Sequence, residues 1–180
     1  HSWYRRQRQM CIRDRAQAVE VWRGPASAVL GGNALHGAIN VISPVPQRTS
    51  LGIEVGNYDF ARVNAAGGFT RGDHTVGASI VGTTTNGYRD STGYGQQKAS
   101  LAHLTEVSGW AVKNQFTATL LNQETGAYVR GLEAYEDPDL RSFNPNPEAF
   151  RDAWSMRASS EWTKDQWTLK PYLCLLYTSD

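Results

Sequence analysis

The chain has 180 residues, of which 40% are apolar, 11% aromatic and 19% charged. This length is enough for one ordinary domain or for part of a larger protein. No run approaches 18 consecutive apolar residues, which excludes a membrane-spanning helix. The formal net charge is +1 and its signs are scattered, so the sequence offers no basic face and we expect no nucleic-acid partner.

The two ends of the chain differ in character from the rest. Residues 1–15 are basic, polar and without hydrophobic periodicity, and they lack the apolar core of a signal peptide. The run Arg5–Arg15 resembles a translated sequencing adapter of the transposase type, and the tail Cys174–Asp180 resembles its reverse complement. We therefore interpret residues 1–15 and 174–180 as read-through artefact; the alternative is a basic tail and a last short strand.

Excluding both ends leaves Ala16–Leu173 as the plausible protein. Five arginines and two aspartates are then removed, so 13 basic and 15 acidic residues remain and the net charge becomes −2. Both cysteines, Cys11 and Cys174, are also removed, and we infer no disulfide framework and no thiol site. A chain without cysteine is compatible with an oxidising envelope compartment. We expect this chain to be an internal fragment of a longer protein.

Residues 16–46 form a compact, apolar region that is punctuated by glycine. Pro25 suits the first turn of a short helix over Ala26–Leu30, and Pro44 and Pro46 predict a short, stiff connector after a strand. The residues that indicate two short strands in this region are Val19, Val21, Ile39, Val41 and Ile42.

From Thr49 onward, apolar and polar residues alternate with a period of two, as in Leu51, Ile53 and Val55. This alternation predicts strands that each have one apolar and one polar face. The expected strands lie at 51–55, 61–70, 75–80, 94–104, 110–120 and 154–162, with a last, broken strand from Trp167.

The connections between these strands alternate in length. Tight turns lie near 71–73, 106–109 and 164–166, whereas longer loops lie at 83–93 and 123–148; only the short first hairpin, near 56–59, breaks the rule. Short turns at one end and long loops at the other are typical of transmembrane antiparallel barrels, which must close because lipid cannot pair backbone amides. The aromatic residues beside the tight turns, expected at one membrane interface, are Phe69, Trp110, Trp162 and Trp167. A soluble β-sandwich or barrel with buried tryptophans is the alternative.

Residues Val19–Ser43 read VEVWRGPASAVLGGNALHGAINVIS. This segment resembles the end of the plug domain in TonB-dependent outer-membrane receptors, in which a strand, an Arg-Gly-Pro turn, small residues, a Gly-rich segment and an Ile-Asn-Val-Ile-like strand precede the first barrel strand. One departure is Val29-Leu30-Gly31, where the family commonly has Leu-Tyr-Gly. The plug-motif residues are Arg23, Gly24, Pro25, Gly31, Gly37 and Asn40.

The resemblance implies an all-β fold: a fragment of a large antiparallel transmembrane β-barrel with the end of an N-terminal plug domain. Residues 16–46 would belong to the plug and residues 47–173 to about seven barrel strands. The glycines of the motif would allow tight turns and close backbone approach to the wall. Arg23 would be buried in the complete receptor and ion-paired with carboxylates of the inner wall.

The resemblance also implies a function. The intact protein would be no enzyme and would need no cofactor; it would take up a scarce ligand, most often a ferric siderophore, across the outer membrane of a Gram-negative bacterium. The TonB protein would supply energy through an early plug segment, the TonB box, which this chain lacks. Its partners would be TonB, a metal chelate or similar small molecule, and outer-membrane lipid. A passive porin or adhesin-type barrel and a soluble secreted β-domain that binds a ligand are the alternatives.

Two loops carry the residues that we expect to contact a ligand, because aromatic rings and arginines suit an anionic metal chelate. These residues are Tyr88, Arg89, Tyr94, Tyr128, Arg130 and Tyr135. The nearby acids could hold calcium, although such loops are more often simply solvated; they are Glu133, Glu136, Asp137 and Asp139. His36, His74 and His103 are widely spaced in different predicted elements, so we predict no metal site.

Overall fold

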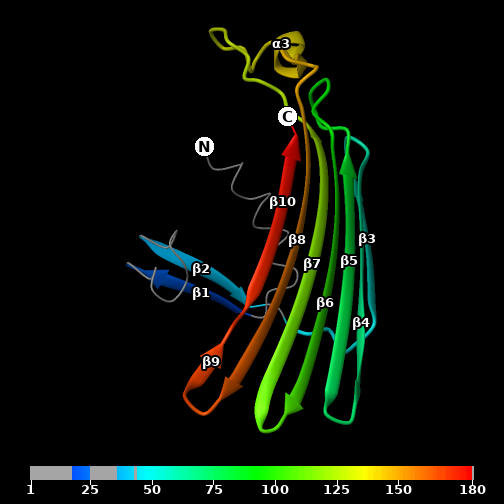
Figure 1. Ribbon diagram of the computed structural model, residues 1–180. Coiled ribbons are helices and arrows are strands. Elements are labelled where there is room, and N and C mark those ends of the chain that lie inside the picture. Colours follow the sequence, from blue (N-terminus) through cyan, green and yellow to red (C-terminus); the bar gives the residue numbers. More distant parts are fainter. Residues whose placement is uncertain (1–17, 25–35, 43, 180) are drawn as a thin grey trace. The chain divides into compact units, whose positions relative to one another are not determined.

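The computed structural model describes residues 18–24, 36–42 and 44–179. The chain separates into two units, His1–Pro44 and Val45–Asp180, and the point of division lies two residues before the predicted end of the plug region. Figure 1 shows both units, which we describe one at a time. Within the described residues, no helix is both long and apolar enough to cross a membrane.

The first unit contains two antiparallel strands, β1 (Ala18–Arg23) and β2 (Gly37–Ile42). They pair with each other and are not part of the larger sheet. Gly24 and Gly37 adopt φ angles of 95° and 146°, and a Cβ atom on Gly37 would collide with the carbonyl oxygen of Trp22. Both positions therefore require glycine. The predicted helix at 26–30 lies outside the described residues.

The second unit is an antiparallel sheet in which each strand pairs with the next one in the chain, except that the last strand pairs with the one two places before it, so the predicted fold class is confirmed. Its helical content is one short helix, α3 (Pro138–Ser142), within a loop. The strands are β3 (Ser50–Gly56), β4 (Phe60–Arg71), β5 (His74–Thr85), β6 (Tyr94–Val107), β7 (Trp110–Glu124), β8 (Phe150–Lys164), β9 (Trp167–Leu169) and β10 (Tyr172–Ser179).

The last two strands occupy a single place in the sheet. Both β9 and β10 pair with β8 in one continuous register, and the interruption lies at Lys170 and Pro171. Pro171 has no N–H group, but its carbonyl oxygen accepts a hydrogen bond from the Ser160 amide at 3.0 Å. The tail that we interpret as adapter thus forms part of a paired strand. This pairing does not test the origin of those residues, which stays a prediction.

The connections fall into two groups, as the sequence predicted. At one end lie the two-residue turns 72–73, 108–109 and 165–166. Ser108 and Gly109 have φ angles of 52° and 74°, which is the primed turn that matches the twist of paired strands. At the opposite end lie 57–59, 86–93 and 125–149. Figure 1 shows the long strands running between these two ends.

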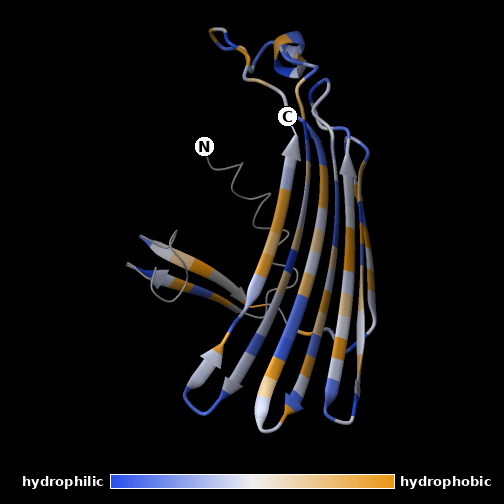
Figure 2. Ribbon diagram, in the orientation of Figure 1, coloured by the Kyte–Doolittle hydropathy of each residue, from blue (hydrophilic) through white to orange (hydrophobic). Residues whose placement is uncertain are grey.

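The constant register aligns side chains of one kind across the whole sheet, so that it has an apolar face and a polar face. Figure 2 shows hydrophobic residues interspersed with hydrophilic ones along the strands. The apolar face is formed mainly by Leu51, Ile53, Val55, Val63, Phe69, Val76, Ile80, Leu101, Phe116, Leu120, Trp154, Met156, Leu173 and Leu175. The polar face includes Glu54, Arg62, Lys98, Lys113, Gln115, Thr117, Thr119, Arg157 and Glu161.

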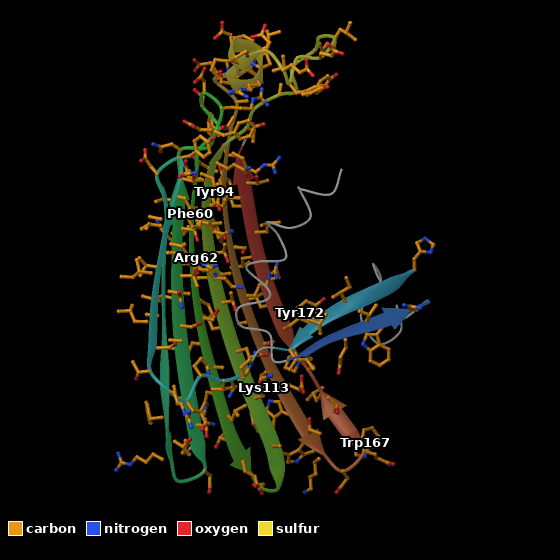
Figure 3. The ribbon with its side chains drawn as sticks, turned by 180° about the vertical axis from the view of Figure 1, so that it is seen from behind. Phe60, Arg62, Tyr94, Lys113, Trp167 and Tyr172 are labelled. Atoms are coloured by element: carbon orange, nitrogen blue, oxygen red, sulfur yellow. The ribbon has the colours of Figure 1, made fainter. Side chains whose placement is uncertain are left out.

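Charges on the polar face meet across neighbouring strands. The guanidinium of Arg62 lies 3.8 Å from the carboxylate of Glu54 on β3, and the ammonium of Lys170 lies 2.8 Å from the carboxylate of Glu161 on β8. Figure 3 shows Arg62 and Lys113 on β4 and β7, respectively. Opposite charges placed directly across a sheet stabilise the pairing of the strands.

The apolar face has almost no protein cover. Val112, at 4% exposure, is the only buried hydrophobic side chain among the described residues. By contrast, Val55 is 80% exposed and Leu51 is 71% exposed. A soluble β-sandwich would bury this face against a second sheet, whereas the described strands of the second unit all belong to one sheet.

The connector between the two units runs over the polar face. Gly68 on β4 and Gly77 on β5 lie directly opposite each other on that face. A Cβ atom on either glycine would collide with the carbonyl oxygen of Pro46, and one on Gly77 would also meet Val45. The two glycines thus make a flat strip on which Val45 and Pro46 lie.

Replacing Gly77 with valine tests this contact. Valine suits a strand, but its side chain would force the connector off the sheet, and overpacking of this kind costs about 1–3 kcal/mol. Gly82→Val is the matched control, because it lies on the same strand and a Cβ there meets nothing within 4 Å. We expect Gly77→Val alone to lower the urea midpoint of unfolding of the full-length protein; equal midpoints for the two variants would contradict the contact.

Candidate ligand-binding surface at the loop end

Three connections meet at the end of the sheet opposite the tight turns, and we call them the loop layer: 57–59, 86–93 and 125–149. The amide of Asn86 donates to the carbonyl oxygen of Tyr58 at 2.9 Å, which joins the first connection to the second. The amide of Asp90 donates to the carbonyl oxygen of Ser142 at 3.0 Å, which joins the second to the third. The short first hairpin therefore takes part in the same layer as the longer loops.

Arg89 holds the two longer connections together. Its Nη2 atom lies 2.7 Å from the carbonyl oxygens of both Ala127 and Phe143, and its Nε atom donates to Phe143 at 3.1 Å. Hydrogen bonds from a charged donor are the stronger kind. The predicted ligand residue Arg89 thus has a structural role in the loop layer.

A buried amide strengthens the long loop. Asn144 is 4% exposed, and its side chain donates to the carbonyl oxygen of Ser91 at 3.0 Å. Its Oδ1 atom accepts from the amide of Asn146 at 2.9 Å, so both ends of the amide group are satisfied. The Asp137 carboxylate accepts from the amides of Asp139 and Leu140 and caps α3.

Several predicted ligand residues lie exposed on the loop layer. Tyr128 is 73% exposed, and Arg130 stacks over its ring at 5.5 Å while donating to its hydroxyl group at 3.1 Å. Tyr135 is also exposed, as is Tyr88, whose ring meets that of Tyr58 edge to face with centroids 6.4 Å apart. Exposed rings beside a cation form a surface that suits a planar or anionic ligand.

Tyr94 occupies a different place from the other predicted ligand residues. It is the first residue of β6, is half-buried, and belongs to the polar face, where Figure 3 shows it near the loop end together with Phe60. The sequence analysis missed Tyr58, because a lone tyrosine in a three-residue turn carries no functional pattern. Only the pairing of β4 with β5 brings it beside Tyr88.

The plug-motif residues are described only in part. Arg23 is exposed at the end of β1, and Asn40 lies opposite Glu20 in the register of β1 and β2. Pro25 and Gly31 lie outside the described residues. The ion pair expected for Arg23 concerned the complete receptor and stays a prediction.

Two of the histidines meet although they belong to different elements. The register of β5 and β6 brings the rings of His74 and His103 into a stack with centroids 5.3 Å apart, a contact that the sequence did not predict. Across the described ranges, no three His, Cys, Asp or Glu side chains are grouped so that they could hold a metal ion. The acidic residues of the long loop therefore form no such group either.

No protein-family model and no curated protein matches this sequence. Among solved structures, the chain is similar to the siderophore receptor PiuA from Acinetobacter baumannii, with a TM-score of 0.70 and 13% identity over 91% of this chain and 26% of that chain. It is also similar to a chain of the FpvAI–pyocin S2 complex, with a TM-score of 0.64 and 16% identity over 90% of this chain and 24% of that chain.

At these identities the likeness establishes the fold. The chain has the fold of part of these receptor structures, which confirms the resemblance inferred from Val19–Ser43 at the level of the fold. It spans about a quarter of the length of the solved chains.

The role of Arg89 can be tested by limited proteolysis. Arg89→Ala removes the hydrogen bonds to Ala127 and Phe143, so we expect the long loop of the full-length protein to be cleaved roughly tenfold faster, which corresponds to about 1.4 kcal/mol of lost local stability. The control is Arg130→Ala, whose side chain contacts Tyr128 on the exposed surface. Cleavage at the same rate in both variants would show that Arg89 does not hold the layer.

Proposed function

We propose that this chain is part of a TonB-dependent receptor of the Gram-negative outer membrane that actively imports a scarce ligand, a ferric siderophore. The observation that carries the proposal is the two-faced sheet: its apolar face is open across every strand, while the connector from the first unit lies on its polar face. A barrel in lipid with a plug inside it needs this arrangement. A soluble β-domain would instead bury the apolar face.

The lengths of the strands suit a membrane crossing. β7 and β8 each have 15 residues, which at about 3.4 Å per residue is roughly 50 Å. A strand of that length, even when tilted by about 45°, exceeds the apolar band of about 25 Å. Both strands would therefore cross the membrane and extend beyond it.

The aromatic residues suit the two edges of such a band. Trp154 on β8 lies on the apolar face toward the loop end. Trp162 lies on the same strand and the same face toward the tight turns, and Trp110 lies nearby across the register. Trp154 and Trp162 are separated by roughly 27 Å along the strand, at about 3.4 Å per residue. With a tilt of about 45°, this corresponds to roughly 19 Å across the membrane, which places the two tryptophans toward opposite edges of an apolar band of about 25 Å.

The sheet also needs further strands. Within the described part of the chain, β3 and β10 each pair on one side only. Unpaired strand edges cannot persist in lipid, because their amides would have no partner. The chain covers about a quarter of its structural neighbours, and we infer that the rest of the protein supplies the strands that close the barrel.

We assign ligand capture to the loop layer, where Tyr128, Arg130 and Tyr135 are exposed. PiuA is a siderophore receptor, and this supports a siderophore as the ligand class. TonB would supply the energy through a plug segment that precedes residue 16.

Arg23 would be ion-paired in the closed barrel. We expect Arg23→Ala to lower the free energy of unfolding by about 3–5 kcal/mol, which tests that pairing.

Uptake under iron limitation tests the proposed function. Cells that carry the full-length gene should import a ferric siderophore only when TonB is present; import without TonB would instead indicate a passive porin.

Replacing Tyr128, Arg130 and Tyr135 together with alanine should weaken ligand binding by roughly tenfold or more, since exposed tyrosine and arginine anchors each carry a large share of binding energy.

The matched control replaces Leu132, Glu133 and Glu136 of the same loop with alanine. All variants should reach the membrane and keep the heat-modifiable mobility of a folded barrel in electrophoresis. If both triple variants bind the ligand as tightly as the native protein, the loop layer is not the capture surface.

A further inference from the structure

A row of polar side chains interrupts the apolar face near the tight turns. We call it the polar row, and it consists of His74, His103, Asn114, Ser160 and Trp162. His103, Asn114 and Ser160 lie directly opposite one another on β6, β7 and β8. In a lipid-facing wall, polar groups at this place are costly unless they are hydrogen-bonded.

The members of the polar row are joined by hydrogen bonds across four strands. The indole Nε1 of Trp162 donates to Ser160 Oγ at 2.7 Å, and Ser160 Oγ donates to Asn114 Oδ1 at 2.6 Å. Asn114 Nδ2 lies 3.5 Å from His103 Nδ1, and His103 Nε2 lies 3.0 Å from His74 Nδ1. The side chains thus form one connected hydrogen-bond network.

The direction of donation along this hydrogen-bond network follows from its first member, Trp162. An indole N–H can only donate, so each following residue accepts on one side and donates on the other. In this arrangement His103 Nδ1 accepts from Asn114, and His103 Nε2 donates to His74 Nδ1. His74 then accepts at Nδ1, and in that tautomer Nε2 is its donor, for which the described residues provide no acceptor. The row of donors therefore ends on an atom that can donate to a group from outside the sheet.

An apolar groove of about 520 Å³ begins at the polar row. Its walls include Leu101, Phe116, Ala158 and Leu173, all from the apolar face, and His103, Asn114 and Ser160 line its polar end. A groove with hydrogen-bond donors at one end and hydrocarbon along its length matches an amphipathic molecule.

The charged residues on the apolar face indicate the charge of the molecule that would bind there. At the turn end, the face carries Arg71 on β4 and Lys164 on β8, and the adjoining turns carry Asp73 and Asp165. The acids of the face itself, Glu124 and Asp152, lie at the loop end. Lys164 lies over the ring of Trp110 at 6.0 Å. The polar row therefore lies at the end of the face that carries its two cations.

We propose that the polar row and its groove bind one anionic phospholipid. The phosphate oxygens accept hydrogen bonds from His74 Nε2 and from the Asn114 amide, and one acyl chain lies between Leu101, Phe116 and Leu173. This inference rests on the proposed function, because it requires the apolar face to meet lipid. It concerns the outer wall near the tight turns and not the ligand surface of the loop layer.

Native mass spectrometry of the full-length receptor in a mild detergent tests this site. The probes are phosphatidylglycerol and phosphatidylcholine with identical acyl chains at equal concentrations. We expect the native protein to retain one phosphatidylglycerol with at least tenfold preference over phosphatidylcholine. His103→Leu should abolish this preference, because leucine breaks the chain of donors while it keeps the wall apolar.

Gln97→Leu is the control, since Gln97 lies on the same strand and the same face but outside the polar row. It should keep the preference of the native protein. Equal retention of the two lipids by a native protein that is inserted and heat-modifiable would overturn the lipid site and leave the transport proposal intact. A native protein recovered only in the soluble fraction would overturn the transport proposal and the lipid site with it.

Discussion

The fold depends on the alternation of side chains along strands that share a constant register. Each strand presents apolar residues to one side, and because no strand is shifted, these residues lie on one face of the sheet from Leu51 on β3 to Leu173 on β10. Such a surface is unfavourable in water in proportion to its area. A single slip of one residue would turn a strand's apolar side chains to the polar face. The register therefore decides which side of the sheet must be covered.

The connector gives an independent assignment of the two sides. Val45 and Pro46 lie against Gly68 and Gly77 on the polar face, so the segment before β3 begins on that side of the sheet. If the polar face is the inner one, the apolar face is the outer one and meets lipid. The hydropathy of the side chains and the path of the backbone thus both assign the polar face to the inside of the barrel. The two observations rest on different residues.

The sequence was sufficient for the strands and for their order, because a period of two is visible without any structure. It was less reliable where small polar residues continue a strand: β5 extends to Thr85, whereas the alternation seemed to end at Ile80. Gly82 and the threonines after it resemble a loop in composition. Their place in the sheet is fixed by pairing with β4 and β6.

Contacts that depend on register could not be predicted from the sequence. His74 and His103 are 29 residues apart, and only the β5–β6 pairing stacks them. The structural role of Arg89 could not be predicted either, because its partners Ala127 and Phe143 lie in a loop whose sequence has no periodicity. Arginine and tyrosine in a loop indicate that the loop can form polar and aromatic contacts. The sequence does not distinguish a residue that contacts a ligand from one that holds the loop in place.

The most direct test of the account is the environment of alternate residues along β7. Residues 16–173 contain no cysteine, so single cysteines at 116, 117, 118, 119 and 120 can be spin-labelled in the full-length protein after Cys11 and Cys174, where present, are replaced. In lipid vesicles, labels at Phe116, Ala118 and Leu120 should be accessible to oxygen and protected from a water-soluble nickel complex. Labels at Thr117 and Thr119 should show the opposite preference or protection from both reagents. Nickel accessibility at all five positions, without a period of two, would contradict the assignment of the apolar face to lipid.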